Sequence, residues 1–82
     1  DFAETNLDDL EQKIFERLRW WRVETAKAHN TAAFIIFHDS TLREIAKAKP
    51  RSLEDLRGVT GVGAKKLESY GEELVSLIAE FL

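Results

Sequence analysis

The sequence contains no cysteine, and only one proline and four glycines occur among its 82 residues. Without cysteine the chain forms neither a disulfide framework nor a thiolate metal site, and this composition fits a reducing compartment. No apolar run approaches the roughly 18 residues that a membrane-spanning helix requires. The first residue is Asp1 rather than methionine, so we expect the chain to be a piece of a longer protein.

The sequence also lacks the usual signals of catalysis. It has no Gly-x-x-x-x-Gly-Lys-Ser/Thr phosphate loop, so we expect no ATPase site in this chain. His29 and His38 have no partners at the spacing of metal ligands. The adjacent acids Glu72 and Glu73 diverge by about 100° on a helix and therefore cannot work as a facing pair. We expect no catalytic residue, no metal and no cofactor.

The composition is that of one small globular domain, with 44% hydrophobic and 33% charged residues. We predict that residues 1–6 form a tail or linker and that residues 7–82 form the domain. The net charge of −3 is unevenly distributed. Residues 1–11 carry five acids and no base, residues 43–66 carry a net +4, and residues 67–82 carry four acids and no base. This pattern predicts a basic surface flanked by acidic ones, or simply solvated helix faces.

Apolar residues recur at intervals of three and four along the first third of the domain, which predicts a long amphipathic helix over residues 7–29. We expect Asn6 to be its N-cap and Asp8 and Asp9 to lie in its first turn. The predicted core lane of this helix consists of Leu7, Leu10, Ile14, Leu18, Trp21 and Ala28. Residues 30–38 are predicted to be an extended loop or a helical turn, because the chain offers no convincing second strand to pair with them.

Four more helices are predicted in the rest of the chain. A second covers residues 41–49, follows a cap at Asp39 or Ser40, and ends at Pro50. A third opens with a capping-box variant and ends at Gly58. A fourth covers residues 64–70, and a fifth follows it. The capping-box variant consists of Ser52 and Asp55, and Gly71 separates the last two predicted helices. These residues predict an all-α, compact five-helix domain.

Residues 56–67 have the form of a helix-hairpin-helix turn. Gly61 and Gly63 permit unusual dihedral angles and leave no side chain between the backbone and a ligand. The N–H groups that open the next helix, together with Lys65 and Lys66, would then contact a phosphate. The alternative is structural: the glycines let two helices turn tightly while neighbouring valines pack.

Four features occur in a characteristic order: residues 18–22 (LRWWR), residues 33–46 (AFIIFHDSTLREIA), Pro50 and residues 61–71 (GVGAKKLESYG). Together they resemble the HRDC domain, the helicase and ribonuclease D C-terminal module, most of all that of bacterial RecQ-type DNA helicases. The resemblance implies an orthogonal bundle of five helices that regulates an ATP-dependent helicase in the cytoplasm, at the bacterial nucleoid. A ribonuclease D-like parent is the alternative.

The resemblance also implies that Phe34 stacks on a base, as single-strand binding requires when cations lie nearby. Its apolar neighbours are equally consistent with a buried Phe34. The predicted nucleic-acid-binding residues are Phe34, Arg43, Lys47, Lys49, Arg51, Gly61, Gly63, Lys65 and Lys66. Ala32 and Ala33 stand where many relatives place a proline. Because the overall charge is acidic, we expect the monomeric domain to bind single-stranded or partial-duplex DNA only weakly.

A second hypothesis is a protein-interaction module that docks on other domains of the parent helicase. Trp20 lies on the charged face of the first predicted helix, where it is a cation–π partner of Arg17, an anchor for a partner, or a second stacking platform. The predicted partner surface consists of Trp20, Glu68, Glu72, Glu73 and Glu80.

Overall fold

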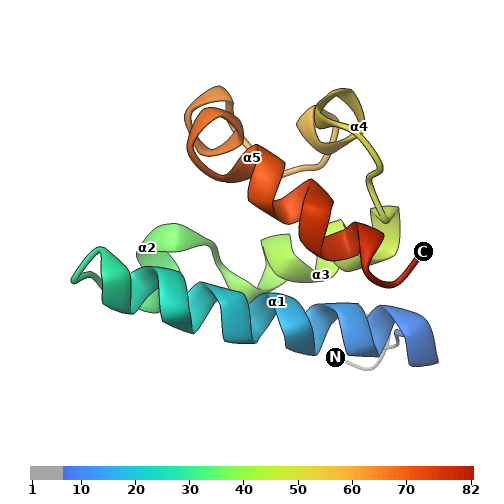
Figure 1. Ribbon diagram of the computed structural model, residues 1–82, viewed down its shortest axis with the longest axis horizontal. Helices are drawn as coiled ribbons and strands as arrows, with labels where there is room; N and C mark the ends of the chain where they lie inside the picture. The colour runs from blue at the N-terminus through green and yellow to red at the C-terminus, as the bar shows by residue number, and fades with distance from the viewer. Residues whose placement is uncertain (1–6) are drawn as a thin grey trace.

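The structure is a computed structural model that describes residues 7–82; the predicted tail, residues 1–6, lies outside the described residues. All regular secondary structure within residues 7–82 is helical, as predicted (Figure 1). In chain order the helices are α1 (Asp9–Ala28), α2 (Ala33–Ile36), α3 (Asp39–Ala48), α4 (Leu53–Arg57) and α5 (Ala64–Ala79). The count of five agrees with the prediction, although α2 was not among the predicted helices and α5 joins two of them.

Helix α1 begins later than predicted because Asp8, and not Asn6, is its N-cap. The Asp8 carboxylate accepts a hydrogen bond from the Glu11 N–H (2.7 Å), and the Glu11 carboxylate accepts one from the Asp8 N–H (3.1 Å). This reciprocal capping box satisfies N–H groups that the first turn of a helix leaves without partners. Asn6 itself lies outside the described residues.

One face of α1 lies in the core, including Ile14, Leu18 and Trp21 as predicted. The prediction is wrong for Ala28, which is exposed, and for Leu10, which is 36% exposed. The buried face is wider than a single lane because α1 packs against α2, α3 and α5. The additional buried residues of α1 are Phe15, Arg22 and Ala26.

The connection after α1 contains a helical turn, α2, so the extended alternative for residues 30–38 is wrong. Helix α3 starts at Asp39, two residues before the predicted start, with His38 as its N-cap. Neither Asp39 nor Ser40 is the cap; the Asp39 carboxylate instead pairs with Arg22 of α1. At its other end α3 stops before Pro50, as predicted.

Helix α4 begins and ends at the predicted residues. The Ser52 hydroxyl oxygen accepts a hydrogen bond from the Asp55 N–H (3.1 Å). The capping box is not reciprocal, because the Asp55 carboxylate accepts its hydrogen bond from the Arg51 N–H (3.3 Å). Gly58 is the C-cap of α4.

Helix α5 is continuous, so the predicted break at Gly71 is wrong. Gly71 is buried, and a β-carbon built there would lie 2.8 Å from Leu53 Cδ2 and 3.2 Å from Leu67 Cδ1. The glycine therefore allows α4 to pack closely against α5. Its helix-propensity cost, about 1 kcal/mol relative to alanine, is offset by this packing and by the buried residues that follow it.

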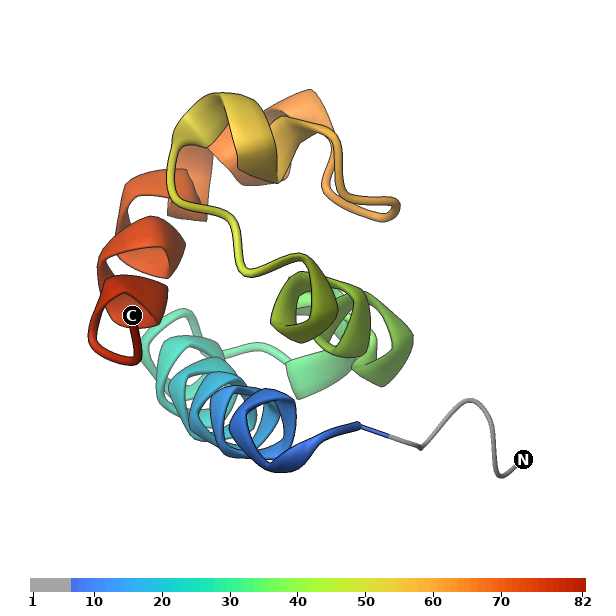
Figure 2. The ribbon, with the colours of Figure 1, turned by 90° about the vertical axis from the view of Figure 1, so that its right-hand side faces the viewer.

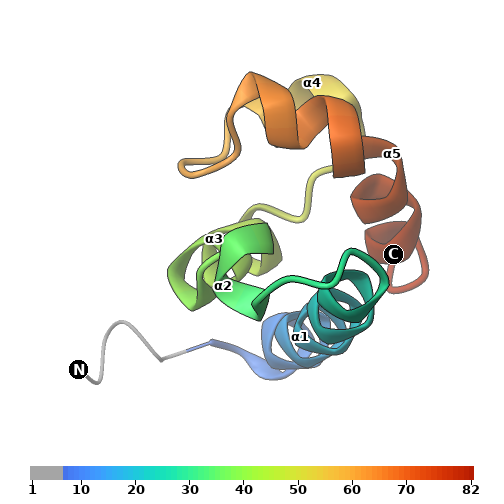
Figure 3. The same ribbon diagram turned by 90° about the vertical axis from the view of Figure 1, so that its left-hand side faces the viewer.

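The helices pack around a single cluster of buried side chains. Figures 2 and 3 show α2 and α3 on the same side of the molecule as α1, whereas α4 and the start of α5 lie on the other side and the end of α5 returns toward α1. Trp21 lies at the aromatic centre, with its ring 5.5 Å from that of Tyr70 and 6.2 Å from that of Phe37. The fully buried side chains include Ile14, Leu18, Leu42, Ile45, Leu56, Leu74 and Ile78.

Candidate nucleic-acid interface

The aromatic ring of Phe34 lies on the surface of α2, with 61% of the residue exposed. Its ring is roughly parallel to that of His38, with 6.3 Å between the ring centres and 24° between the planes. Both residues line an open pocket of about 450 Å³, together with Arg22 and Asp39. The alternative that Phe34 belongs to the core is therefore wrong.

Arg22 holds the junction between α2 and α3 from inside the domain. Its guanidinium donates a hydrogen bond from Nη1 to the carbonyl oxygen of Phe37 (2.9 Å) and pairs through Nη2 with Asp39 Oδ1 (2.7 Å). The hydrogen bond from Arg22 holds the pKa of Asp39 below its ordinary value, despite the opposing effect of burial. This role was not predicted, because the partners Phe37 and Asp39 are distant from Arg22 in the sequence and no local motif links them to it.

Lys66 connects the start of α5 to α2. Its Nζ donates a hydrogen bond to the Ile35 carbonyl oxygen (2.6 Å) and lies 5.8 Å from the centre of the Phe37 ring and 6.0 Å from that of Tyr70. Two predicted parts of the interface, the aromatic segment and the basic turn, are thus brought together. Lys66 has a structural contact in addition to any phosphate contact, whereas Lys65 beside it is exposed.

The two glycines of the turn have different surroundings. Gly61 has a φ of +97°, and a β-carbon there would collide with the Thr41 side chain, whose Cγ2 would be 3.0 Å away. Gly63 is the N-cap of α5 in an extended conformation, and within residues 7–82 no atom lies within 4 Å of a β-carbon built on it. A structural role in a tight turn therefore accounts for Gly61. Gly63 instead faces open space beside the unpaired N–H groups of the first turn of α5.

The predicted cations of α3 spread along that helix. The Arg43 guanidinium carbon lies 5.7 Å from the centre of the Phe15 ring, and Lys47 Nζ lies 4.0 Å from a carboxylate oxygen of Glu44. Arg51 is exposed beyond the end of α3, whereas Phe34 precedes its start. A ten-residue helix is about 15 Å long, so the predicted residues form an extended surface rather than one compact site.

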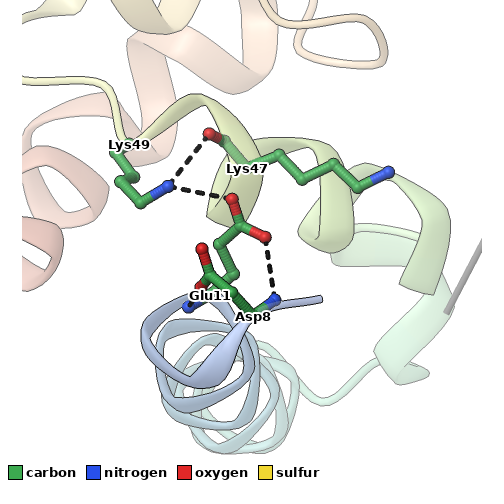
Figure 4. A network of polar contacts seen from close by, with 4 residues as sticks. All are labelled: Asp8, Glu11, Lys47 and Lys49. Atoms are coloured by element: carbon green, nitrogen blue, oxygen red, sulfur yellow. Dashed lines mark hydrogen bonds and ion pairs between the residues drawn. The ribbon is translucent and has the colours of Figure 1, made fainter. Parts of the chain in front are cut away.

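Lys49 has a structural partner at the start of α1. Its Nζ donates a hydrogen bond to Glu11 Oε2 (2.9 Å) and contacts the Lys47 carbonyl oxygen (3.4 Å), as Figure 4 shows. This bond from Lys49 lowers the pKa of Glu11, and the hydrogen bond with the Asp8 N–H lowers it further. In the same view the Lys47 ammonium points away from the network. Of these two lysines, Lys47 is therefore the more available for an external anion.

The predicted partner residues lie on α1 and along α5. Trp20 is 59% exposed, and the Arg17 guanidinium carbon lies 5.1 Å from the centre of its ring, so the predicted cation–π contact is present. Arg17 Nε also lies 3.8 Å from Glu80 Oε1. The other three acids, Glu68, Glu72 and Glu73, line an open groove between α4 and α5.

Neither a metal centre nor a membrane span is found in the part of the chain that the structure describes. No group of three or more His, Asp or Glu side chains within residues 7–82 is arranged to hold a metal ion. In the same region, no helix combines the length and the apolar character that crossing a membrane requires.

The HRDC domain family matches residues 11–78. The chain is 37% identical over 76 residues to ATP-dependent DNA helicase UvrD2 of Mycobacterium tuberculosis, covering 93% of this chain and 11% of that protein. It is 37% identical over 72 residues to ATP-dependent DNA helicase RecQ of Haemophilus influenzae, covering 88% and 12%. The chain thus spans about a tenth of the length of these relatives.

The structure is similar to that of D. radiodurans RecQ HRDC domain 3, with a TM-score of 0.82 and 36% identity over 85% of this chain and 92% of that chain. The predicted resemblance and fold are therefore confirmed. The UvrD2 relatives add a class of helicase that the sequence motifs did not suggest. On the family match, the sequence relatives and the shared fold together, the chain belongs to the HRDC domain family.

Proposed function

We propose that this chain is a non-catalytic accessory domain of a RecQ-like DNA helicase and that it tunes which DNA structures the enzyme recognises. In this proposal it acts through weak nucleic-acid contact and through contacts with other domains of its parent. The observation that carries the proposal is the exposed ring of Phe34, which lies on a helix that Lys66 attaches to the start of α5.

The position of Phe34 supports contact with a single strand. Stacking of a base on an aromatic side chain contributes about 1–3 kcal/mol and tolerates any base, because every base has a π-face. The open pocket beside Phe34 leaves room for such a base, and His38 lies roughly parallel to the same ring. An unpaired base would therefore find an accessible aromatic surface on α2.

Backbone and side-chain donors around this surface support phosphate contacts. Gly63 leaves open space in front of the first turn of α5, where N–H groups and the exposed Lys65 are available to a phosphate. Further phosphate contacts are proposed along α3, from Arg43 and Lys47, and beyond its end, from Arg51. Lys49 contributes less, because Glu11 already engages its ammonium.

Weak affinity is part of the proposal. The net charge is −3, and the affinity of proteins for DNA depends on how many phosphates their cations neutralise. Few cations are available on this surface, and four acids follow them on α5 and at its end. We therefore propose that the domain binds as a monomer and modulates a larger enzyme. Because the RecQ and UvrD2 relatives include bacterial DNA helicases, we place this action at the nucleoid, in the cytoplasm.

A second candidate function is a module that contacts only proteins. The exposed Trp20 and the acids on α5 favour it, because a tryptophan anchor and complementary charge are common at protein interfaces. A ribonuclease D-like parent would use the same surfaces. The protein-only candidate differs from the first proposal in one measurable respect, which is whether the domain alone binds DNA.

The test is a titration of the chain against fluorescent single-stranded and partial-duplex DNA at about 50 and about 200 mM salt. We expect binding at the lower salt that weakens sharply at the higher salt. Phe34→Ala should weaken binding about tenfold at constant salt, since it removes a stacking surface. Charge reversal in Lys65→Glu should reduce both the affinity and its dependence on salt.

Ile35→Ala is the matched control, because Ile35 lies on the same short helix and is 51% exposed but has no aromatic ring. It should bind DNA like the parent chain. Equal affinity of Phe34→Ala and Ile35→Ala would exclude stacking at Phe34. A chain that binds neither DNA at either salt concentration would overturn the nucleic-acid proposal and leave the protein-contact candidate.

A further inference from the structure

An apolar groove lies between α4 and α5. Its volume is about 500 Å³, and its apolar lining comes from Leu53, Ala64 and Leu67. Leu53 is 42% exposed although it packs toward Gly71, whose missing side chain makes room for it. The groove is therefore a product of the close packing of α4 against α5, and it leaves aliphatic surface accessible.

The rim of this groove is strongly acidic. Glu68, Glu72 and Glu73 line it, and Arg57 is the single base among its lining residues. Glu68 and Glu72 are four residues apart on one helix, a spacing at which like charges repel and reduce helix stability. A cationic partner would relieve this repulsion, whereas a nucleic-acid phosphate would increase it.

The acidic rim continues along α5 into a second open groove. Glu72 and Glu73 line both grooves, and Glu80 lines the second together with Ser76 and Leu77. Glu80 is the C-cap of α5, where the helix dipole favours a positive charge instead. The acids thus continue along α5, and in the second groove Arg17 lies among them, with its Nε 3.8 Å from Glu80 Oε1.

We propose that the α4–α5 groove is a docking site for a basic polypeptide segment in which one apolar side chain is flanked by lysines or arginines. The apolar side chain occupies the space beside Leu53 and Leu67, and the flanking cations pair with Glu68 and Glu72. This inference rests on the interdomain part of the proposed function and specifies the chemistry of the partner.

The groove does not use the residues proposed to contact DNA. Phe34, Lys65 and Lys66 are not among its lining residues, although Ala64 in the first turn of α5 is. A segment of the kind proposed would thus attach the domain to its parent while α2 remains exposed. Neutralising the groove acids should then leave DNA binding intact.

The experiment uses the isotope-labelled 82-residue chain and a synthetic peptide with one central leucine between lysines. We expect amide chemical-shift changes at Leu53, Ala64, Leu67 and Glu72 on titration. Replacing the central leucine of the peptide by serine should weaken binding about tenfold, which corresponds to the lost burial of one aliphatic side chain. In the chain, Glu68→Gln with Glu72→Gln should weaken binding by a similar factor.

The matched control is Glu24→Gln with Glu54→Gln, which removes the same charge from exposed acids outside the groove. It should bind the peptide nearly as well as the parent chain. Equal binding of the leucine and serine peptides would show attraction by charge alone and would overturn the proposal. Shift changes located elsewhere would also overturn it.

Two other occupants are distinguishable in the same series. If the groove amides shift with the concentration of the chain alone and sedimentation shows a dimer, a second copy occupies the groove and the proposal fails. If single-stranded DNA displaces the peptide from the groove, the site binds nucleic acid and the proposal fails. If the chain does not bind the peptide but binds DNA through Phe34, only the proposed docking groove is refuted. If the chain binds the peptide but not DNA, only the proposed nucleic-acid contact is refuted.

Discussion

Lys66 on α5 donates a hydrogen bond of 2.6 Å to the main-chain carbonyl oxygen of Ile35 on α2, across 31 residues of sequence. Helix α2 has only four residues, and a helix this short is not stable without tertiary contacts. The bond therefore helps to hold the helix that exposes Phe34. A lysine of the glycine-turn motif thus supports the aromatic part of the proposed interface as well as adding charge.

We expect Lys66→Met to lower the free energy of unfolding by about 1 kcal/mol, because the aliphatic stem remains and one hydrogen bond is lost. Amide hydrogen exchange of residues 33–37 should become faster. Lys65→Met is the control, since Lys65 is exposed and should affect unfolding little. Urea denaturation and exchange measurements check this prediction. Equal stability of the two variants, with unchanged exchange in α2, would contradict it.

We expect stability to fall when the solution is acidified. Hydrogen bonds from Arg22 and Lys49 lower the pKa of Asp39 and Glu11 below their ordinary values of 3.8 and 4.5. A carboxylate with a lowered pKa in the folded state contributes stability that is complete above its unfolded-state pKa. That contribution is lost as the pH falls through the folded-state pKa.

Urea denaturation from about pH 7 to about pH 3 measures this loss. The variant Asp39→Asn with Glu11→Gln should be less stable at neutral pH and should lose less stability on acidification than the parent chain. Parallel curves for the two proteins would refute the assignment of the acid sensitivity to these carboxylates.

The two glycines of the turn should differ in their tolerance of alanine. Gly61→Ala should lower the free energy of unfolding by about 1–3 kcal/mol, because it combines a φ of +97° with a collision against Thr41. Gly63→Ala should change stability by less than about 0.5 kcal/mol, because its β-carbon enters open space. Thermal unfolding of both variants compares them directly. A larger loss for Gly63→Ala would be incompatible with the structure of the turn.

Much of the fold was predictable because its signals are local. The apolar spacing predicted helices for α1 and α3, Pro50 predicted the end of α3, and Ser52 predicted the start of α4. The break at Gly71 was the main error, because glycine at that position serves a contact with Leu53 from another helix. Local propensity could not show that contact.

The residues of the candidate interface could be predicted from the sequence, but the surroundings of each residue could not. The motifs identified Phe34, Lys49 and Lys66, yet they did not show that Phe34 is exposed or that Lys49 is bound to Glu11. Arg22 belongs to the LRWWR feature, but its role was not predicted, since its partners become neighbours only after α2 and α3 fold against α1.

The sequence by itself determined that this is an all-helical HRDC domain with a glycine turn, because periodicity, caps and turn residues act between near neighbours in the chain. Only the tertiary structure decided which cations are engaged, that Phe34 is accessible, and that Leu53 opens an acid-rimmed groove beside α5. Exposure and ion pairing depend on residues that are distant in sequence, and these meet only when the helices pack.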